Sequence, residues 1–288
     1  MKKLIALILS MLLLAGCAPA VYDGPTESAW VLTEQATTFY NTVTGETQSH
    51  IRTYSYDGMG NEVRSCYYTD GEPTSEYRYT YDDRGNRIRE VSWNHFWFFT
   101  YPSSRTARTY DEQNRLLTTT YRNGFGIKTG QDIYIYDDEA NTVHWDGTYD
   151  TQTKYLNENG DPIRVVTFSE PAGMEIETLY EYDALGRNTK ITEYYDGALA
   201  MTTQRRCDEL DRPLEYTIYD ADGSIVNRTT WLYEENTVTS FDSEGNRTIE
   251  TLGPDGQVTL AESYDKDGNL TSRSVYTYTE IQIPAKEE

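Results

Sequence analysis

The feature that most constrains the fold is a short motif that returns along most of the chain. An aromatic residue is followed by Asp, two variable residues, and then Gly with Asn or Arg, as in Tyr81-Asp82-Asp83-Arg84-Gly85-Asn86. Asp at the first position of a type I turn accepts hydrogen bonds from backbone N–H groups just ahead of it. Gly supplies the left-handed residue that closes a hairpin with a bulge. The strong copies predict structural turns at Asp57, Gly60, Asp82, Gly85, Asp183, Gly186, Asp242, Gly245, Asp265 and Gly268.

The segments between these turns have the pattern of β-strands. Tyr77, Tyr79 and Tyr81 alternate with Arg78 and Thr80, and a period of two is typical of a strand with two different faces. Most copies recur at intervals of 22 to 29 residues with a short Asp-Gly turn between them, so that each unit holds about two strands. No long stretch after the first twenty residues shows a helical period with caps. We therefore predict an all-β fold, an elongated antiparallel array of β-hairpins that forms one twisted, solenoid-like meander.

The motif resembles the YD repeat of RHS-type bacterial proteins, and the resemblance covers roughly residues 50 to 280. It implies a long antiparallel sheet that twists into a spiral, which in large members closes into a shell around a C-terminal toxin. We expect this chain to be too short for a closed shell and to lack a separate effector after the repeats. We therefore expect an open sheet whose end strands are exposed edges.

The first residues have the layout of a secretory signal. Lys2 and Lys3 precede an apolar run of eleven residues, whereas a membrane-spanning helix needs about 20. The tetrad Leu14-Ala15-Gly16-Cys17 resembles the lipobox of bacterial lipoproteins, which implies cleavage before Cys17 and attachment of diacylglycerol and palmitate to that residue. The alternative is an ordinary signal peptide with an accidental Cys. The expected division is a signal peptide (1–16), a lipidated Cys and tether (17–25), the repeat domain (26–283) and an acidic tail (284–288).

Charge and cysteine content limit the partners. Loss of Lys2 and Lys3 leaves 23 of the 25 basic residues against 47 acidic ones, a net charge of −24. Such a chain is not expected to bind nucleic acid, whose phosphates need Lys and Arg. The acidity serves solubility or, as an alternative, recognition of a basic partner. Cys66 and Cys207 are expected to be two separate thiols.

The sequence carries no recognisable catalytic constellation. His50, His95 and His144 lack the spacing of metal ligands, and no phosphate-binding loop is present, so we expect no metal and no cofactor beyond the lipid. The aromatic stretch of residues 93–101 is a candidate ligand surface. The alternative is that it closes the core of a widened repeat. The candidate ligand-binding aromatics are Trp93, Phe96, Trp97, Phe98 and Tyr101.

Three functions remain open at this point. The first is a non-catalytic lipoprotein of the cell envelope, anchored in the cell membrane and facing outside the cytoplasm, which binds an envelope protein or glycan or acts as a structural module. The second is a carbohydrate- or cell-wall-binding repeat protein, because Tyr219-Asp220-Ala221-Asp222-Gly223 resembles part of the aromatic hairpin repeats of choline- and glucan-binding proteins. The third is a lipid-anchored hydrolase.

Overall fold

The computed structural model describes residues 26–96 and 99–285, and this part of the chain consists of β-strands, turns and loops without a helix. None of it forms a helix that could cross a membrane. The strands are β1 (Thr26–Tyr40), β2 (Thr47–Tyr56), β3 (Glu62–Thr69), β4 (Glu72–Tyr81), β5 (Arg87–Phe96), β6 (Phe99–Tyr110), β7 (Leu116–Asn123), β8 (Lys128–Asp137), β9 (Thr142–Asp146), β10 (Asp150–Leu156), β11 (Pro162–Ser169), β12 (Met174–Tyr182), β13 (Asn188–Tyr195), β14 (Ala198–Cys207), β15 (Pro213–Asp220), β16 (Ile225–Tyr233), β17 (Thr237–Phe241), β18 (Arg247–Leu252), β19 (Val258–Tyr264) and β20 (Leu270–Pro284). The prediction of an all-β, antiparallel fold is confirmed.

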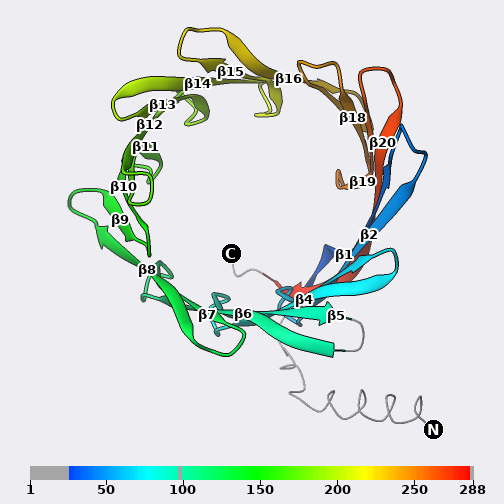
Figure 1. Ribbon diagram of the computed structural model, residues 1–288, viewed down its shortest axis with the longest axis horizontal. Helices are drawn as coiled ribbons and strands as arrows, with labels where there is room; N and C mark the ends of the chain where they lie inside the picture. Colours follow the sequence, from blue (N-terminus) through cyan, green and yellow to red (C-terminus); the bar gives the residue numbers. More distant parts are fainter. Residues whose placement is uncertain (1–25, 97–98, 286–288) are drawn as a thin grey trace.

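The sheet is closed. Each strand pairs antiparallel with the next, and β1 pairs both with β2 and with β20, so that the twenty strands form a continuous ring (Figure 1). At the closure Thr26 lies opposite Pro284 and Phe39 lies opposite Ser272. The expectation of an open, elongated array with exposed end strands is wrong. Closure joins two strands of 15 residues each, so neither end of the sheet is left as an edge.

The turn between β2 and β3 shows how the motif reverses the chain. The amide of Asp57 donates to the carbonyl of Asn61 (3.0 Å), and the Asp57 carboxylate accepts from the amides of Met59 and Asn61 (2.9 Å each). Gly60 has φ +82°, the left-handed region in which a side chain is strained. Weaker copies place Asn114 and Asp211 in the same conformation, which Asn and Asp tolerate better than other residues. All ten strong-copy residues lie in turns of this kind.

The ring has two rims, because antiparallel strands alternate in direction. Rim A is the rim at which β1 begins and β20 ends, and rim B is the opposite one. As far as β15, the five-residue turns headed by Asp lie on rim A, whereas rim B has short turns such as Asp70-Gly71 and Asp196-Gly197 and a five-residue turn headed by Asn123. Five-residue turns headed by Asp then appear on rim B, at residues 220–224, 242–246 and 265–269, while a five-residue turn at residues 253–257 stays on rim A. The turns headed by Asp therefore change rim after β15.

The two faces of the sheet differ in composition and exposure. In β4 the tyrosines Tyr77, Tyr79 and Tyr81 are half-buried, whereas Arg78 and Thr80 on the opposite face are exposed. The same alternation holds in β8 and β20. Side chains inside a closed ring converge and shield one another, and those outside spread apart. The less exposed tyrosine face is therefore the inner face of the ring.

This inner face is not packed like an ordinary core. Among the described residues the buried apolar side chains are Val165 on this face and Cys66 on the outer face, while small polar residues of the inner face such as Ser65 and Thr119 are almost completely buried. Tyrosine rings and arginine side chains cover these small residues, for example where Arg52 lies over Tyr54 and Tyr67. Stability is therefore spread over the strand ladder and many neighbouring side-chain contacts.

Tyrosine hydroxyls tie the strands together near rim A. Seven of the described tyrosines donate a hydrogen bond to a backbone carbonyl of the preceding strand, at 2.7 to 3.1 Å. Six of the seven lie at the rim A end of their strand, next to a turn, whereas Tyr278 lies in the middle of β20. The bond explains why the motif uses Tyr rather than Phe before the turn. The pairs are Tyr56–Leu32, Tyr81–Glu62, Tyr110–Arg87, Tyr136–Leu116, Tyr182–Pro162, Tyr233–Pro213 and Tyr278–Val258.

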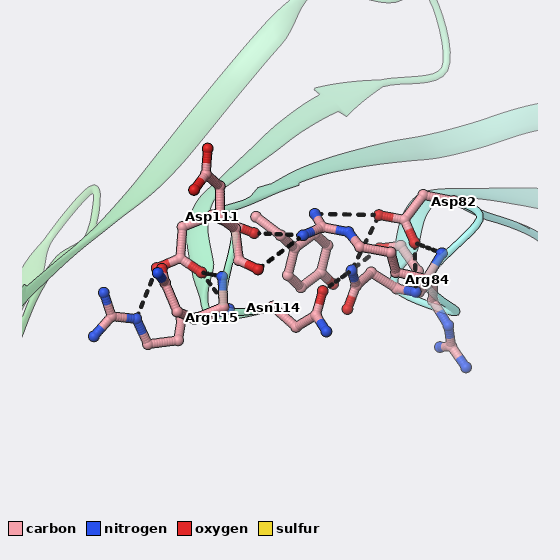
Figure 2. A network of polar contacts seen from close by, with 10 residues as sticks. Asp82, Arg84, Asp111, Asn114 and Arg115 are labelled. Carbon is pink, nitrogen blue, oxygen red and sulfur yellow. Dashed lines mark hydrogen bonds and ion pairs between the residues drawn. The ribbon is translucent and has the colours of Figure 1, made fainter. Parts of the chain in front are cut away.

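Neighbouring turns of rim A also bind one another directly (Figure 2). Arg84 donates through Nη1 to the carbonyls of Asp111 (2.9 Å) and Glu112 (3.3 Å) in the next turn. Arg115 pairs with Asp111 in its own turn (2.7 Å) and with Asp138 in the following one (2.6 Å). Arginines of these turns therefore link successive hairpins along the rim.

Candidate functional site on the tyrosine face

The aromatic stretch singled out from the sequence is divided between the two faces. Trp93 lies on the outer face, with the Arg78 guanidinium 5.4 Å from its ring centroid. Phe96 (62% exposed) and Tyr101 (50%) lie on the inner face at the rim B end of the β5–β6 hairpin. Strand alternation thus prevents these side chains from forming one surface. Cys17, Trp97 and Phe98 lie outside the described residues.

A different group of side chains meets on the inner face of β7–β10. Tyr121, Asp132, Trp145, Tyr149 and Asp150 line a hollow of about 350 Å³ together with Thr129, Gly130 and Thr148. A second hollow of about 260 Å³ lies beside it and is lined by Tyr134, Val143, Trp145, Gln152 and Lys154. Trp145 belongs to both, since it lies opposite Tyr134 on one neighbouring strand and Gln152 on the other. We call the residues that line the two hollows the Trp145 site.

Two glycines permit the close packing of this site. A Cβ on Gly130 would lie 2.6 Å from Thr148 Oγ1, and a Cβ on Gly147 would lie 2.6 Å from Trp145 Cζ2. The Gly147 amide donates to the Asp150 carbonyl (2.9 Å), which holds the β9–β10 turn against the tryptophan. Glycine within a strand often marks such a close approach. The sequence pattern did not single out Trp145, but the paired glycines were an available signal.

The polar groups of the site are partly satisfied. Tyr121 donates to Asp132 Oδ2 (2.8 Å), and burial together with this carboxylate raises the pKa of Tyr121 to about 12. The hydroxyl therefore stays protonated at neutral pH. Trp145 Nε1 and Asp150 Oδ1 are buried and have no hydrogen-bond partner in the described protein. A buried polar group without a partner costs about 1–3 kcal/mol, which a bound ligand with matching groups can offset.

The outer face holds a second buried polar group, Glu76, which is 3% exposed. It accepts from Arg64 Nη2 (2.8 Å) and from Arg78 Nε, and His95 Nε2 is 3.8 Å away. Burial alone would raise the pKa of Glu76, but the hydrogen bonds from Arg64 and Arg78 outweigh it and hold the pKa below its usual value. The Glu76 carboxylate therefore stays charged, and both of its oxygens accept hydrogen bonds from arginines, which is typical of a structural ion network.

Neither cysteine of the described chain is arranged as a nucleophile. Cys66 and Cys207 are both free, and burial raises the pKa of each thiol, which disfavours the reactive thiolate. Within residues 26–96 and 99–285, no group of three or more His, Cys, Asp or Glu side chains is placed to hold a metal ion.

Comparisons with known proteins identify no family. No family model and no curated protein matches the chain. Among solved structures, a porin-like protein from Bacteroides uniformis ATCC 8492 has a TM-score of 0.41 at 11% identity, over 88% of this chain and 99% of that one. The TcdB2-TccC3 structure has a TM-score of 0.35 at 12% identity, over 84% of this chain and 18% of that one. Scores this low carry no argument about function, which must come from the site itself.

Proposed function

We propose that the chain is a non-catalytic, lipid-anchored binding module of the cell envelope, in which the inner face of the ring receives the ligand. The observation that carries the proposal is that this face holds half-buried tyrosines and an aromatic hollow with unsatisfied polar groups instead of a packed apolar core. Pockets that bind ligands combine aromatic walls with a few polar groups in this way.

The anchor is part of the same proposal. Diacylglycerol and palmitate on Cys17 would hold the protein in the cell membrane, facing outside the cytoplasm, because each buried CH₂ contributes about 0.8 kcal/mol. Residues 17–25 extend to at most about 30 Å, and β1 begins at rim A. Rim A would therefore stand close to the membrane, with rim B turned away from it.

The alternative function is that of a lipid-anchored hydrolase. Asp132 and Asp150 line one hollow, and most glycoside hydrolases use a pair of carboxylates. The carboxylate of Asp132 already accepts the Tyr121 hydroxyl, which favours a binding role. Incubation with a candidate glycan, followed by chromatography of the products, separates the two functions.

The anchor is tested with Cys17→Ser in the full chain, expressed in a bacterium that is fed an alkyne analogue of palmitate. The unsubstituted protein should carry the label and sediment with membranes, and Cys17→Ser should lose both properties. Cys66→Ser is the matched control and should keep both. A labelled Cys17→Ser protein, or an unlabelled parent protein in the soluble fraction, would contradict the proposed anchor.

A further inference from the structure

We infer that the Trp145 site binds two consecutive units of a polysaccharide chain. This inference rests on the proposed function, since it names the ligand class that the inner face of the ring receives. Three features of the site carry it: the aromatic walls, the unsatisfied polar atoms, and the division of the site into two hollows by one indole ring.

The aromatic walls suit a flat, polar ring. Tyr121 is 39% exposed and Tyr149 is 64% exposed, and both line the first hollow with the half-buried Trp145. The faces of sugar rings present C–H groups that pack on aromatic faces, while their hydroxyls stay in the plane. An amphipathic aromatic side chain accepts such a ligand because it offers apolar area and a polar atom together.

The unsatisfied atoms distinguish a sugar from other ligands of an aromatic hollow. Trp145 Nε1 needs an acceptor, and Asp150 Oδ1 needs a donor. A hydroxyl group supplies both functions, because its oxygen accepts while its hydrogen is donated. A quaternary ammonium, the usual occupant of an aromatic cage, supplies neither. A primary ammonium could satisfy Asp150 but would leave the indole N–H without an acceptor.

The charges of the two hollows specify the units further. Asp132 and Asp150 line the first hollow, which has no basic lining residue, so a sugar acid there would be repelled. The second hollow is lined by Lys154, which is exposed, and by Gln152, whose amide is held by a hydrogen bond to Thr167 Oγ1 (3.0 Å). It accepts a neutral or an acidic unit. Because Trp145 borders both hollows, one chain crossing the indole would occupy them together.

The test uses the full chain with Cys17→Ser, so that lipid does not contribute to binding. Isothermal titration calorimetry is used to follow titration with glucose and N-acetylglucosamine tetrasaccharides and with purified glycan strands of peptidoglycan. At least one probe should bind, and Trp145→Ala should weaken that binding at least tenfold. Trp145→Phe keeps a ring but loses the N–H donor and should weaken it several-fold, which keeps the test decisive if the alanine variant does not fold.

Trp93→Phe on the outer face is the matched control and should bind as the unsubstituted protein does. Equal binding by Trp145→Phe, Trp145→Ala and the unsubstituted protein would overturn the inference. So would competition by choline, or failure of every probe while the lipidated protein with Cys17 intact sediments with isolated cell envelopes. Failure of the protein with Cys17 intact to sediment with envelopes would instead overturn the proposed function. Shortening of a bound probe would support the site but refute its non-catalytic role.

Discussion

The buried carboxylate of Glu76 allows a quantitative test of how the outer face is held together. The substitution Glu76→Gln keeps the shape of the side chain but removes its charge. Glu76 is 4% exposed at its side chain and accepts from two guanidinium groups, those of Arg64 and Arg78. We expect the free energy of unfolding to fall substantially.

The magnitude follows from the two bonds and the exposure of their donors. A hydrogen bond to a charged group contributes about 1.5–3 kcal/mol and a neutral one about 1 kcal/mol, so each bond should lose about 1 kcal/mol. The glutamine NH₂ group also has to face one of the two guanidinium donors. Arg64 and Arg78 are 50% and 59% exposed and can be hydrated, so the full penalty of an uncompensated buried charge does not apply. The total is about 2–3 kcal/mol.

Urea unfolding followed by circular dichroism measures this loss. The matched control is Glu181→Gln, which removes an exposed ion pair with Lys190 and should cost less than about 0.5 kcal/mol. Equal losses for the two variants would refute the reasoning. The pH dependence gives a second check, because the pKa of Glu76 is lower in the folded protein than its usual value of 4.5. The advantage of the parent protein over Glu76→Gln should be complete above about pH 5 and should shrink as the pH falls through the lowered folded-state pKa.

Two further predictions concern the turns and the tyrosine contacts. Gly60→Ala should lower the free energy of unfolding by about 1–3 kcal/mol, because φ is +82° and the new Cβ would lie 2.9 Å from Ile283 Cγ2. The control Gly45→Ala, at φ +74° with open space around it, should lower it less. The reverse order of the two variants in urea unfolding would contradict this account. Tyr182→Phe removes the 2.7 Å hydrogen bond to the Pro162 carbonyl and should lower the free energy of unfolding by about 1 kcal/mol. Tyr195→Phe, at a residue that is 37% exposed, should leave it nearly unchanged. Equal thermal unfolding temperatures for both variants and the parent protein would show that the Tyr182 hydroxyl contributes nothing.

Local structure could be predicted from the sequence because its causes are local. The alternation of Tyr77, Tyr79 and Tyr81 with Arg78 and Thr80 indicates a two-faced strand, and the structure contains it as β4. The Asp and Gly residues of the motif act within five residues of one another, so their turns follow from composition. Local patterns do not give the angle that accumulates from one strand to the next, and that angle determines whether twenty strands close.

The candidate site could not be predicted for a related reason. The stretch from Trp93 to Tyr101 has the highest density of aromatic residues, but successive side chains of a strand point to opposite faces of the sheet, so these aromatics are divided between the two faces. The Trp145 site instead combines residues of β7, β8, β9 and β10, each with few aromatics in its own segment. Only the register of four strands brings Tyr121, Asp132 and Trp145 to one surface.

The pairing of β1 with β20 sets the order in which the molecule can assemble. Thr26 and Gln282 are hydrogen-bonded across 256 positions of sequence, whereas every other pair of strands joins neighbours in the chain. Contacts between distant segments form late, because the intervening chain must first lose its freedom. A chain that emerges from the ribosome N-terminus first would therefore keep one side of β1 without a partner until the last strand, β20, has been made. During that interval the unfinished ring could join with a second copy, and rapid delivery of the C-terminal strand protects against it.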